Sequence, residues 1–506
     1  MTKHLDIDTK AMRAKILDLA IRGKLTDQRQ EDGNARDLLK EIQAEKERLI
    51  KEKKIKKEKP LPEITEEEKP FDIPENWEWV RLGNLTSKVG SGNTPKGGKD
   101  SGVYKESGVE FIREMNVYND GLHYDGMVYI SSELAKTRTG SAVVAGDILL
   151  NITGGSIGRC ALVPDNFVLG NVNQHVLIIR NIVASLREYI HLVLCSPLVQ
   201  RYINNSAVGD KAGLSASKTK GFVIPLPPLD EQQRIADKVS ALFAQLDIID
   251  KAYEEYRELQ QAVKAKLLEL AMQGKLTDQR DEDGDARDLL KEIQAEKEKL
   301  IAEKKIKKEK PLPEITEEEK PFEIPENWEW VRLGDIVSKT IKRGKSPQYS
   351  ITGDVLVFAQ KCNTKPGRIN LELAKKLDLS TLKKYPEEEF MLSGDIVINS
   401  TGNGTMGRVG FFRDKDNPHN LKIVPDSHVT TIRVPHDLID NQYIFYFLKK
   451  LQPRLESSGD GSTNQKELKA AIIASICIPL PPLAEQKRIV AKLDELLPHL
   501  NPGKEP

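Results

Sequence analysis

The chain of 506 residues is long enough for more than two folding units. Its hydrophobic fraction of 39% and charged fraction of 30% exclude disorder throughout, and the absence of a long apolar run or a secretory leader predicts a cytoplasmic protein. The net charge is zero, but the charged residues are unevenly distributed. Residues 81–220 carry a net charge of +4 and residues 331–470 one of +6, so the rest of the chain is acidic. Two basic regions favour local attraction of phosphates, because salt screens charges beyond about 10 Å.

The chain repeats part of itself. GKLTDQR at residues 23–29 recurs at 274–280, and IPENWEWVRLG also occurs twice at the same offset. The following hundred or so residues differ almost everywhere, until IPLPPLDEQQRI at 224–235 is matched by IPLPPLAEQKRI at 478–489. A constant frame with divergent inserts indicates identical partners for the frame and different partners for the inserts. A recent duplication with unequal drift would leave the same pattern.

The repeat predicts seven segments and an α+β fold class, with two globular α+β domains joined by long antiparallel coiled-coil helices in a pseudo-two-fold circular repeat. In chain order they are an N-terminal helix (1–22), a helical arm and linker (23–75), a first variable domain (76–228), a central coiled-coil helix (229–273), a repeated arm and linker (274–326), a second variable domain (327–482) and a C-terminal helix (483–506).

The arms are predicted to be helical from Ala35 to about Lys59 and from Ala286 to about Lys310. Each ends in a lysine-rich tract, KEKKIKKEK in the first copy. Such a tract is either a DNA clamp or a solvated arm, and the glutamates that alternate with the lysines favour the arm.

The central segment is expected to be one long helix. Apolar residues recur along it at alternating intervals of four and three, interrupted only at Gln260, which is typical of a coiled coil. From Glu231 to Ala271 it would span roughly 60 Å, and the preceding Pro-Pro pair and Gly274 are expected to bound it. The apolar positions are Ile235, Val239, Leu242, Leu246, Ile249, Tyr253, Tyr256, Val263, Leu267 and Leu270.

The two ends of the chain are expected to supply the partner helix, because together they repeat the same apolar positions in a circular order. This order predicts antiparallel helices with the variable domains at opposite ends, and a coil between two chains is the alternative. The matching residues are Ile489, Leu493, Leu496 and Leu500 at one end and Met12, Ile16 and Leu19 at the other.

Each variable domain is predicted to be α+β, with short strands such as GDILLNITG and GDIVINSTG. Gly402, Gly404 and Gly407 spell G-x-G-x-x-G, but a strand-like segment follows where a dinucleotide site would open a helix, so a glycine turn is predicted. His175 and His428 have no nucleophile or carboxylate motif nearby, which favours structural histidines.

No motif for catalysis or metal binding is found in the sequence. The four cysteines are far apart and form no C-x-x-C pair, so neither a disulfide framework nor a zinc site is predicted. The sequence also has no phosphate-binding loop, no amino-methyltransferase motif, no H-E-x-x-H and no nuclease carboxylate cluster. Any chemistry would therefore come from partner subunits.

The repeated motifs resemble those of specificity subunits of type I restriction-modification enzymes. IPLPPLxEQxRI leading into a heptad helix, PENWEWVRLG before each variable domain and the GDI…TG segments carry the resemblance, which covers essentially the whole chain. It implies two target recognition domains, each reading one half of an asymmetric bipartite site in double-stranded DNA through the major groove. It also implies that the conserved helices set the gap between the half-sites and dock two methyltransferase subunits, which restriction and translocation subunits join.

The resemblance implies a non-catalytic chain that binds no cofactor, with S-adenosylmethionine, ATP and Mg in the partner subunits. Basic residues of the variable domains would position the DNA backbone. Ordinary surface charge is the alternative for each, and Arg159 and Arg408 could be structural because both domains keep them. The candidates are Lys96, Lys99, Arg113, Arg159, Lys218, Lys220, Arg343, Lys345, Lys361, Arg368, Arg408 and Lys466.

Two other function classes fit parts of the sequence. A coiled-coil scaffold without DNA specificity would show no salt-sensitive DNA affinity. An enzyme using the glycine loop as a cofactor site would bind nucleotide stoichiometrically.

Overall fold

The computed structural model describes residues 7–95, 102–206, 213–365, 368–402, 404–457 and 467–500. The chain divides into two compact units, the first ending at Glu254 and the second beginning at Glu255. Helix α7 (Leu229–Met272) contributes its first part to one unit and its last part to the other. Among the described residues, no helix combines the length and the apolar character that a membrane span requires.

The first unit is an α+β structure with short, mostly antiparallel strands. Its elements are α1 (Thr9–Ile21), α2 (Ala35–Lys51), β1 (Glu78–Arg81), β2 (Thr86–Ser91), β3 (Val109–Ile112), β4 (Val117–Tyr118), β5 (Gly121–Leu122), β6 (Val128–Ile130), α3 (Ser132–Lys136), β7 (Ala142–Val143), β8 (Ile148–Asn151), β9 (Cys160–Leu162), β10 (Gly170–Val172), β11 (Val176–Asn181), α4 (Arg187–Cys195), α5 (Pro197–Ser206), α6 (Ala216–Lys220) and β12 (Val223–Leu226).

The second unit repeats this order with differences in its central part. Its elements are α8 (Ala286–Ala302), β13 (Glu329–Arg332), β14 (Lys342–Arg343), β15 (Tyr349–Ser350), β16 (Val355–Phe358), β17 (Lys375–Leu377), β18 (Ile396–Asn399), β19 (Val409–Phe411), β20 (Lys422–Pro425), β21 (Val429–Ile432), α9 (Asn441–Ser457), α10 (Ala470–Ala474), β22 (Cys477–Leu480) and α11 (Leu483–Leu496). The α+β prediction for both variable domains is confirmed.

Each variable domain contains two four-stranded sheets, which we call the inner and the outer sheet. The inner sheets have matching orders, β2-β11-β8-β9 and β14-β21-β18-β19, and a two-stranded ladder, β1-β12 or β13-β22, closes each domain. The outer sheets share a parallel pair, β3-β10 or β16-β20, but differ at the edge: β7 flanks β10 in the first domain, whereas β15 flanks β17 in the second. The two domains therefore have one fold with different outer parts.

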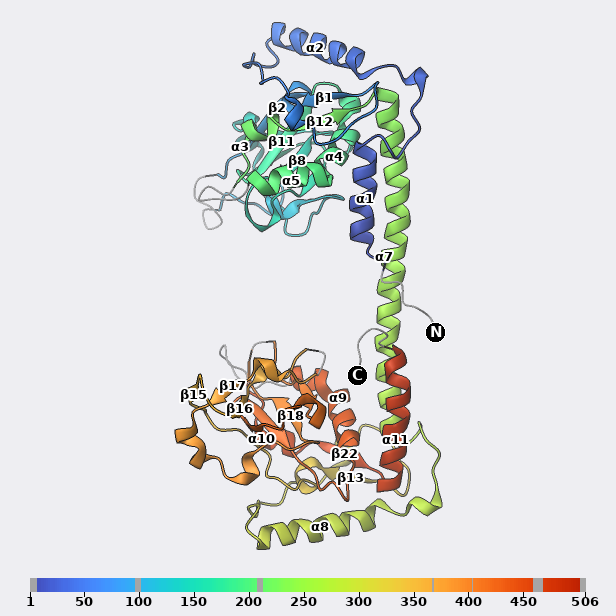
Figure 1. Cartoon of the computed structure of the whole chain (residues 1–506), viewed down its shortest axis with the longest axis vertical. Coiled ribbons are helices and arrows are strands. Elements are labelled where there is room, and N and C mark those ends of the chain that lie inside the picture. Colours follow the sequence, from blue (N-terminus) through green and yellow to red (C-terminus); the bar gives the residue numbers. More distant parts are fainter. Residues whose placement is uncertain are drawn as a thin grey trace. The chain divides into compact units, whose positions relative to one another are not determined.

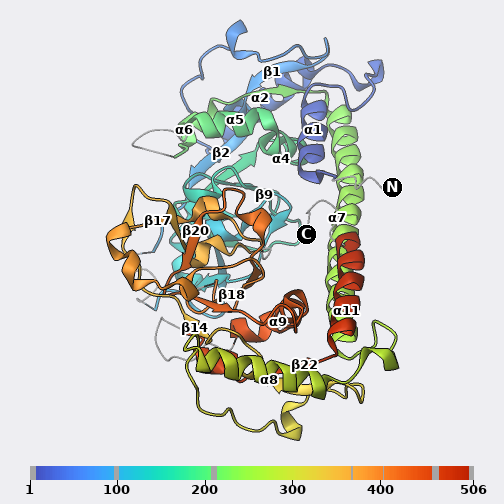
Figure 2. The same cartoon turned by 60° about the horizontal axis from the view of Figure 1, so that its bottom comes forward.

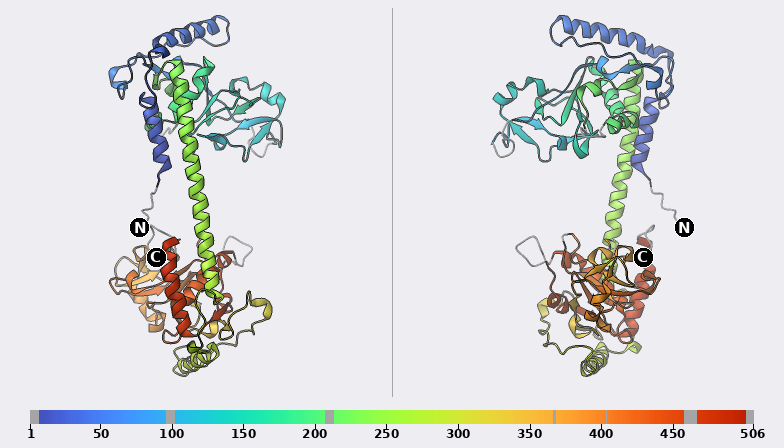
Figure 3. Two further views of the ribbon diagram at one scale, coloured as in Figure 1. Left: turned by 90° about the vertical axis from the view of Figure 1, so that its right-hand side faces the viewer. Right: turned by 60° about the vertical axis from the view of Figure 1, so that its left-hand side comes forward.

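In the first unit, α1 packs antiparallel to the first part of α7 (Figure 1), and both views of Figure 3 show the same pairing. Near the start of α1, Arg13 donates hydrogen bonds to Asp247 and Asp250 at 2.8 and 2.9 Å. Beyond the end of α1, Thr26 donates to Glu231 at the start of α7, at 3.1 Å. The expectation that the N-terminal segment supplies a partner helix is met inside this unit.

In the second unit, α11 pairs with the last part of α7 (Figure 3). Ile489 and Leu493 of α11 are fully buried and share one apolar core with Leu268 and Ala271 of α7. Thr277, beyond the end of α7, donates to Glu485 near the start of α11 at 3.4 Å, so this pair is also antiparallel.

The predicted apolar seam of α7 is buried at its start, exposed at its centre and half-buried at its end, at Leu267 and Leu270. Ile235 and Val239 are buried, whereas Tyr253, Tyr256 and Val263 are 37 to 43% exposed. The described residues therefore do not bury this seam continuously along α7. The boundaries predicted by the Pro-Pro pair and by Gly274 are correct, because α7 begins at Leu229 and ends at Met272.

The arm helices end earlier than the sequence analysis predicted. Helix α2 ends at Lys51 and α8 at Ala302, because Lys53 and Lys304 adopt a left-handed backbone with φ of 58° and 60°. The N–H of the next residue then bonds a carbonyl five residues earlier, as in a Schellman cap, and the rest of each lysine tract is not helical. Helix α8 packs on its own unit (Figure 2), where Lys297 donates to the carbonyl of Gly334 at 2.6 Å.

Candidate nucleic-acid interface

The basic candidates of the first domain differ in their surroundings. Arg113 donates to the carbonyl of Gly126 at 2.6 Å, and Lys218 on α6 is exposed. Lys220 pairs with Glu58, and its aliphatic chain lies against Gly83, so it fixes the arm to the domain. Lys96 and Lys99 lie outside the described residues.

In the second domain, the described candidates other than Arg408 are exposed. Arg343 pairs with Glu467 at 3.2 Å, and the Lys345 ammonium lies 5.7 Å from the centre of the Tyr385 ring. Lys361 and Arg368 are exposed. Lys466 lies outside the described residues.

The shared arginines make different contacts in the two domains. Arg408 donates to the carbonyls of Asn363 and Gly404 at 2.8 and 3.2 Å, so its guanidinium holds the glycine turn together. Arg159 instead lies over the ring of Tyr118, 4.4 Å from its centre, on the β4–β5 hairpin. The structural reading of Arg408 is supported, whereas Arg159 forms part of an aromatic stack at a half-buried position.

The glycine motif forms a turn between strands, and the two histidines make hydrogen bonds within their domains. Gly402, Gly404 and Gly407 have positive φ and lie in the turn between the antiparallel strands β18 and β19, so no helix opens there and the predicted glycine turn is confirmed. His175 and His428 each share a 2.6 Å hydrogen bond through Nδ1 with a threonine that follows strand β8 or β18.

A polar groove of about 760 Å³ between the end of α2 and strand β2 gathers cations that sequence reasoning missed, apart from Lys220. Burial lowers the pKa of Lys46 and of Lys88. At the position in the second domain that corresponds to Lys88, burial lowers the pKa of Lys339 to about 8. Sequence reasoning missed Lys46 and Lys88 because the arm and the domain that carry them meet by tertiary packing.

A buried glutamate joins the frame motifs in each unit. Glu231, in the LPPLDEQ motif, is fully buried and accepts hydrogen bonds from Trp77 at 2.8 Å, Gln28 at 2.6 Å and Thr26 at 3.1 Å. Burial raises the pKa of Glu231. The three donors come from the repeated GKLTDQR and NWEW motifs, so the repeated sequences contact one another. We call this the glutamate hub.

The second unit contains the same hub around Glu485. Trp328 donates to Glu485 at 2.8 Å, Gln279 at 2.6 Å and Thr277 at 3.4 Å. A bidentate ion pair accompanies each hub: Arg234–Asp32 in the first unit, with both bonds at 2.5 Å, and Arg488–Asp283 in the second, with bonds at 2.6 and 2.5 Å. The sequence shows that these residue types recur at matching positions in the two units. It does not show which of the repeated motifs contact one another.

A second repeated contact lies inside each domain. The carboxylate of Asp147 is fully buried and accepts from Arg180 at 2.6 and 2.7 Å, and Asp395 accepts from Arg433 at 2.7 Å on both oxygens. These aspartates belong to the Gly-Asp pairs that both domains share. The pairs fix strand β8 or β18 to its neighbour, which accounts for their presence in two otherwise divergent domains.

Comparison with known proteins identifies the family. The model of the type I restriction modification DNA specificity domain matches residues 74–256 and again residues 325–504. The chain belongs to this family. The two matches each begin just before the NWEW motif and include the hub glutamate, so one family domain contains one variable domain and residues of the helix that follows it.

Several specificity subunits are similar to this chain over most of its length. The EcoAI specificity subunit of Escherichia coli is 29% identical, with 97% of this chain and 89% of the relative covered, and the EcoEI specificity subunit of Escherichia coli is 30% identical, with 96% and 88% covered. A chain from a solved structure of the type I R-M system has a TM-score of 0.55 at 21% identity, with 85% of this chain and 92% of that chain covered, which shows a common fold. The chain is thus a type I specificity subunit with a duplicated DNA specificity domain.

Proposed function

We propose that this specificity subunit reads a bipartite double-stranded DNA site, one half with each variable domain. The conserved helices would set the spacing between the half-sites and dock two methyltransferase subunits, and restriction subunits would join the complex. S-adenosylmethionine, ATP and Mg would be used by those partners and not by this chain. Binding energy would come mainly from phosphate contacts, and specificity from base edges in the major groove.

One observation carries the proposal: the two units keep the same frame contacts while their outer parts differ. The hub around Glu231 recurs around Glu485, and the ladder of β1 recurs in β13. By contrast, the outer sheets end in different edge strands. A repeated frame suits two copies of one partner, and different outer parts suit two different DNA sequences.

Exchange of one variable domain tests whether each domain recognises its half-site independently of the other. Residues 83–221 are replaced by the corresponding segment of another specificity subunit, which leaves the β1–β12 ladder and the Glu231 hub intact. The matched exchange in the second domain is residues 334–475. Each variant is produced with methyltransferase partners, and the modified adenines in host DNA are sequenced.

We expect each exchange to change one half of the recognised site and to leave the other half unchanged. If both half-sites change after a single exchange, the two domains do not read independently and the proposal fails. A coiled-coil scaffold without DNA specificity is the alternative function. It predicts that affinity of the assembled complex for DNA neither depends on sequence nor falls steeply with salt.

A further inference from the structure

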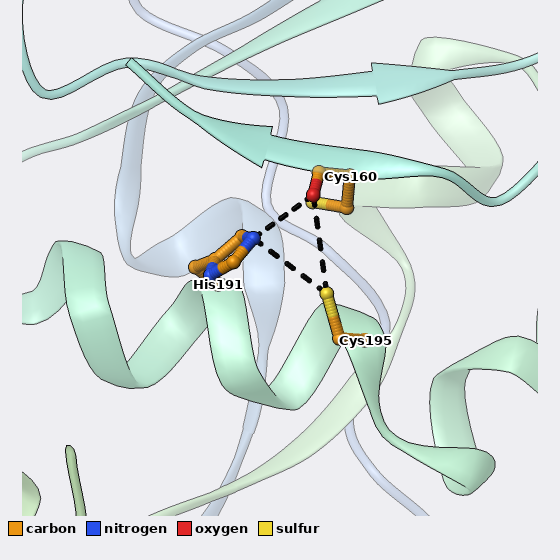
Figure 4. Close-up of side chains that lie close together, drawn as sticks. All are labelled: Cys160, His191 and Cys195. Carbon is orange, nitrogen blue, oxygen red and sulfur yellow. Dashed lines mark hydrogen bonds between the residues drawn. The ribbon is translucent and has the colours of Figure 1, made fainter. Parts of the chain in front are cut away.

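The first unit brings together two cysteines and a histidine that are far apart in sequence. His191 and Cys195 lie one turn apart on α4, so both side chains project from the same face, and Cys160 lies on the neighbouring strand β9 (Figure 4). One ligand atom of each, the two Sγ atoms and a ring nitrogen, lies within 4.8 Å of the others. Among the described residues, no other group of three potential ligands of these types is as compact.

We propose that Cys160, His191 and Cys195 form a zinc site of the first unit. Thiolate and imidazole ligands in this number are typical of Zn²⁺, which takes four ligands in a tetrahedron. Zn–S bonds of about 2.3 Å and Zn–N bonds of about 2.0–2.1 Å place neighbouring S and N ligand atoms roughly 3.6 Å apart. The Cys195 Sγ and His191 Nε2 atoms are already 3.6 Å apart.

The three ligands suit an ion that arrives from one side. Cys160 is fully buried, whereas His191 and Cys195 are half-buried and line a groove of about 940 Å³ between the domain and the α1–α7 helix pair. The groove leaves room for a water molecule or another oxygen ligand at the fourth position. The side chain of Asn119, which accepts from the backbone N–H of Cys160 at 2.9 Å, also lines it.

Binding would change protons at the site. His191 Nε2 now donates to the carbonyl of Cys160 at 2.9 Å, and this nitrogen must lose its proton and turn from the carbonyl to the ion. Zinc binds cysteine as the thiolate, so both thiols must also lose their protons. Zinc binding therefore releases protons, and affinity rises with pH until all three ligands are deprotonated.

The second unit provides an internal comparison. Helices α4 and α9 align through Tyr189 and Tyr443, whose hydroxyls both donate to a proline carbonyl of the closing ladder. At the positions of Cys160, His191 and Cys195 the second unit has Val409, Phe445 and Lys449. Lys449 donates to the carbonyl of Val409 at 3.1 Å, so the structural task of capping this carbonyl needs no cysteine. The pair of thiols in the first unit is thus additional to what the fold requires.

Zinc analysis of the full-length chain tests the site. The reduced chain is stripped with a chelator and titrated with Zn²⁺, and bound zinc per chain is measured by elemental analysis after gel filtration. Co²⁺ serves as a spectroscopic probe, because thiolate ligation gives charge-transfer absorption. We expect about one zinc per chain, since the second unit lacks the ligands, together with a higher midpoint of thermal unfolding in the zinc-bound form.

The variants C160V, H191F and C195K each introduce the residue that stands at the corresponding position of the second unit. The triple variant combines the three substitutions, so that the new side chains can pack together as Val409, Phe445 and Lys449 do. All should lose the zinc and the cobalt absorption, while circular dichroism confirms folding. The control C477S, a cysteine of the second unit, should keep one zinc per chain. The proposal is overturned if the wild-type chain binds no zinc at micromolar concentrations or if folded variants keep it. A Cys160–Cys195 disulfide found by mass spectrometry in place of the metal also overturns it.

Discussion

Shortening α7 by one heptad tests whether this helix sets the distance between the half-sites. Deletion of Ala252–Glu258 removes a stretch whose residues are exposed. The contacts of α1 with Asp247 and Asp250 lie before it, and Leu268 enters the core of the second unit after it. Seven residues make nearly two full turns, so the helix faces on either side of the deletion stay within about 20° of their original phase.

The size of the expected change follows from helix geometry. Helix α7 has 44 residues, and removing seven of them shortens it by about 10 Å at 1.5 Å per residue. Base pairs rise about 3.4 Å, so the preferred gap between half-sites should shrink by up to about three base pairs. Such a change also turns one half-site by close to a third of a turn around the duplex, so affinity should fall even at the best new gap.

The variant is produced with its methyltransferase partners and offered a DNA library in which the gap varies while the half-sites stay fixed. Sequencing the modified members gives the preferred gap. The control replaces Ala252–Glu258 with a different heptad of equal length, which should leave the gap unchanged. An unchanged gap in a folded and active deletion variant would show that α7 is not the ruler, and that domain contacts or the methyltransferase subunits set the spacing.

Three further outcomes are expected. E231Q should lower the free energy of unfolding by about 1–3 kcal/mol in urea, because an amide NH₂ then faces buried donors such as Trp77, and E485Q should cost a similar amount. Burial raises the pKa of Glu231, so its contribution to stability is present at low pH and is lost as the pH rises through the folded-state pKa; E231Q should lack this dependence. R180Q should cost about 3 kcal/mol, since it leaves the buried Asp147 carboxylate without its cation, and a loss below 1 kcal/mol would contradict this account. The purified chain, supplied with S-adenosylmethionine, ATP and Mg, should neither methylate nor cleave DNA, and methyl transfer by the chain alone would refute the non-catalytic assignment.

Local sequence determined the elements whose limits are set by backbone chemistry. The Pro-Pro pair and Gly274 bounded α7 correctly, because proline lacks an N–H for the helix interior and Gly274 adopts a φ of 67°. The glycine turn between β18 and β19 was predicted from the strand-like residues after it. The arm helices were predicted too long, because Lys53 and Lys304 adopt a left-handed backbone that lysine rarely takes.

Tertiary structure alone decided which residues meet. Glu231 and its donor Trp77 are 154 positions apart, and no local spacing could pair them. The same holds for Cys160 and Cys195, whose separation in sequence argued against a metal site until a strand and a helix placed them side by side. Lys220 and Arg408 were selected as basic residues, but packing directs one toward Glu58 and the other toward backbone carbonyls. Charge and periodicity are read along the chain, whereas the partner of a side chain is fixed by the fold that brings distant segments together.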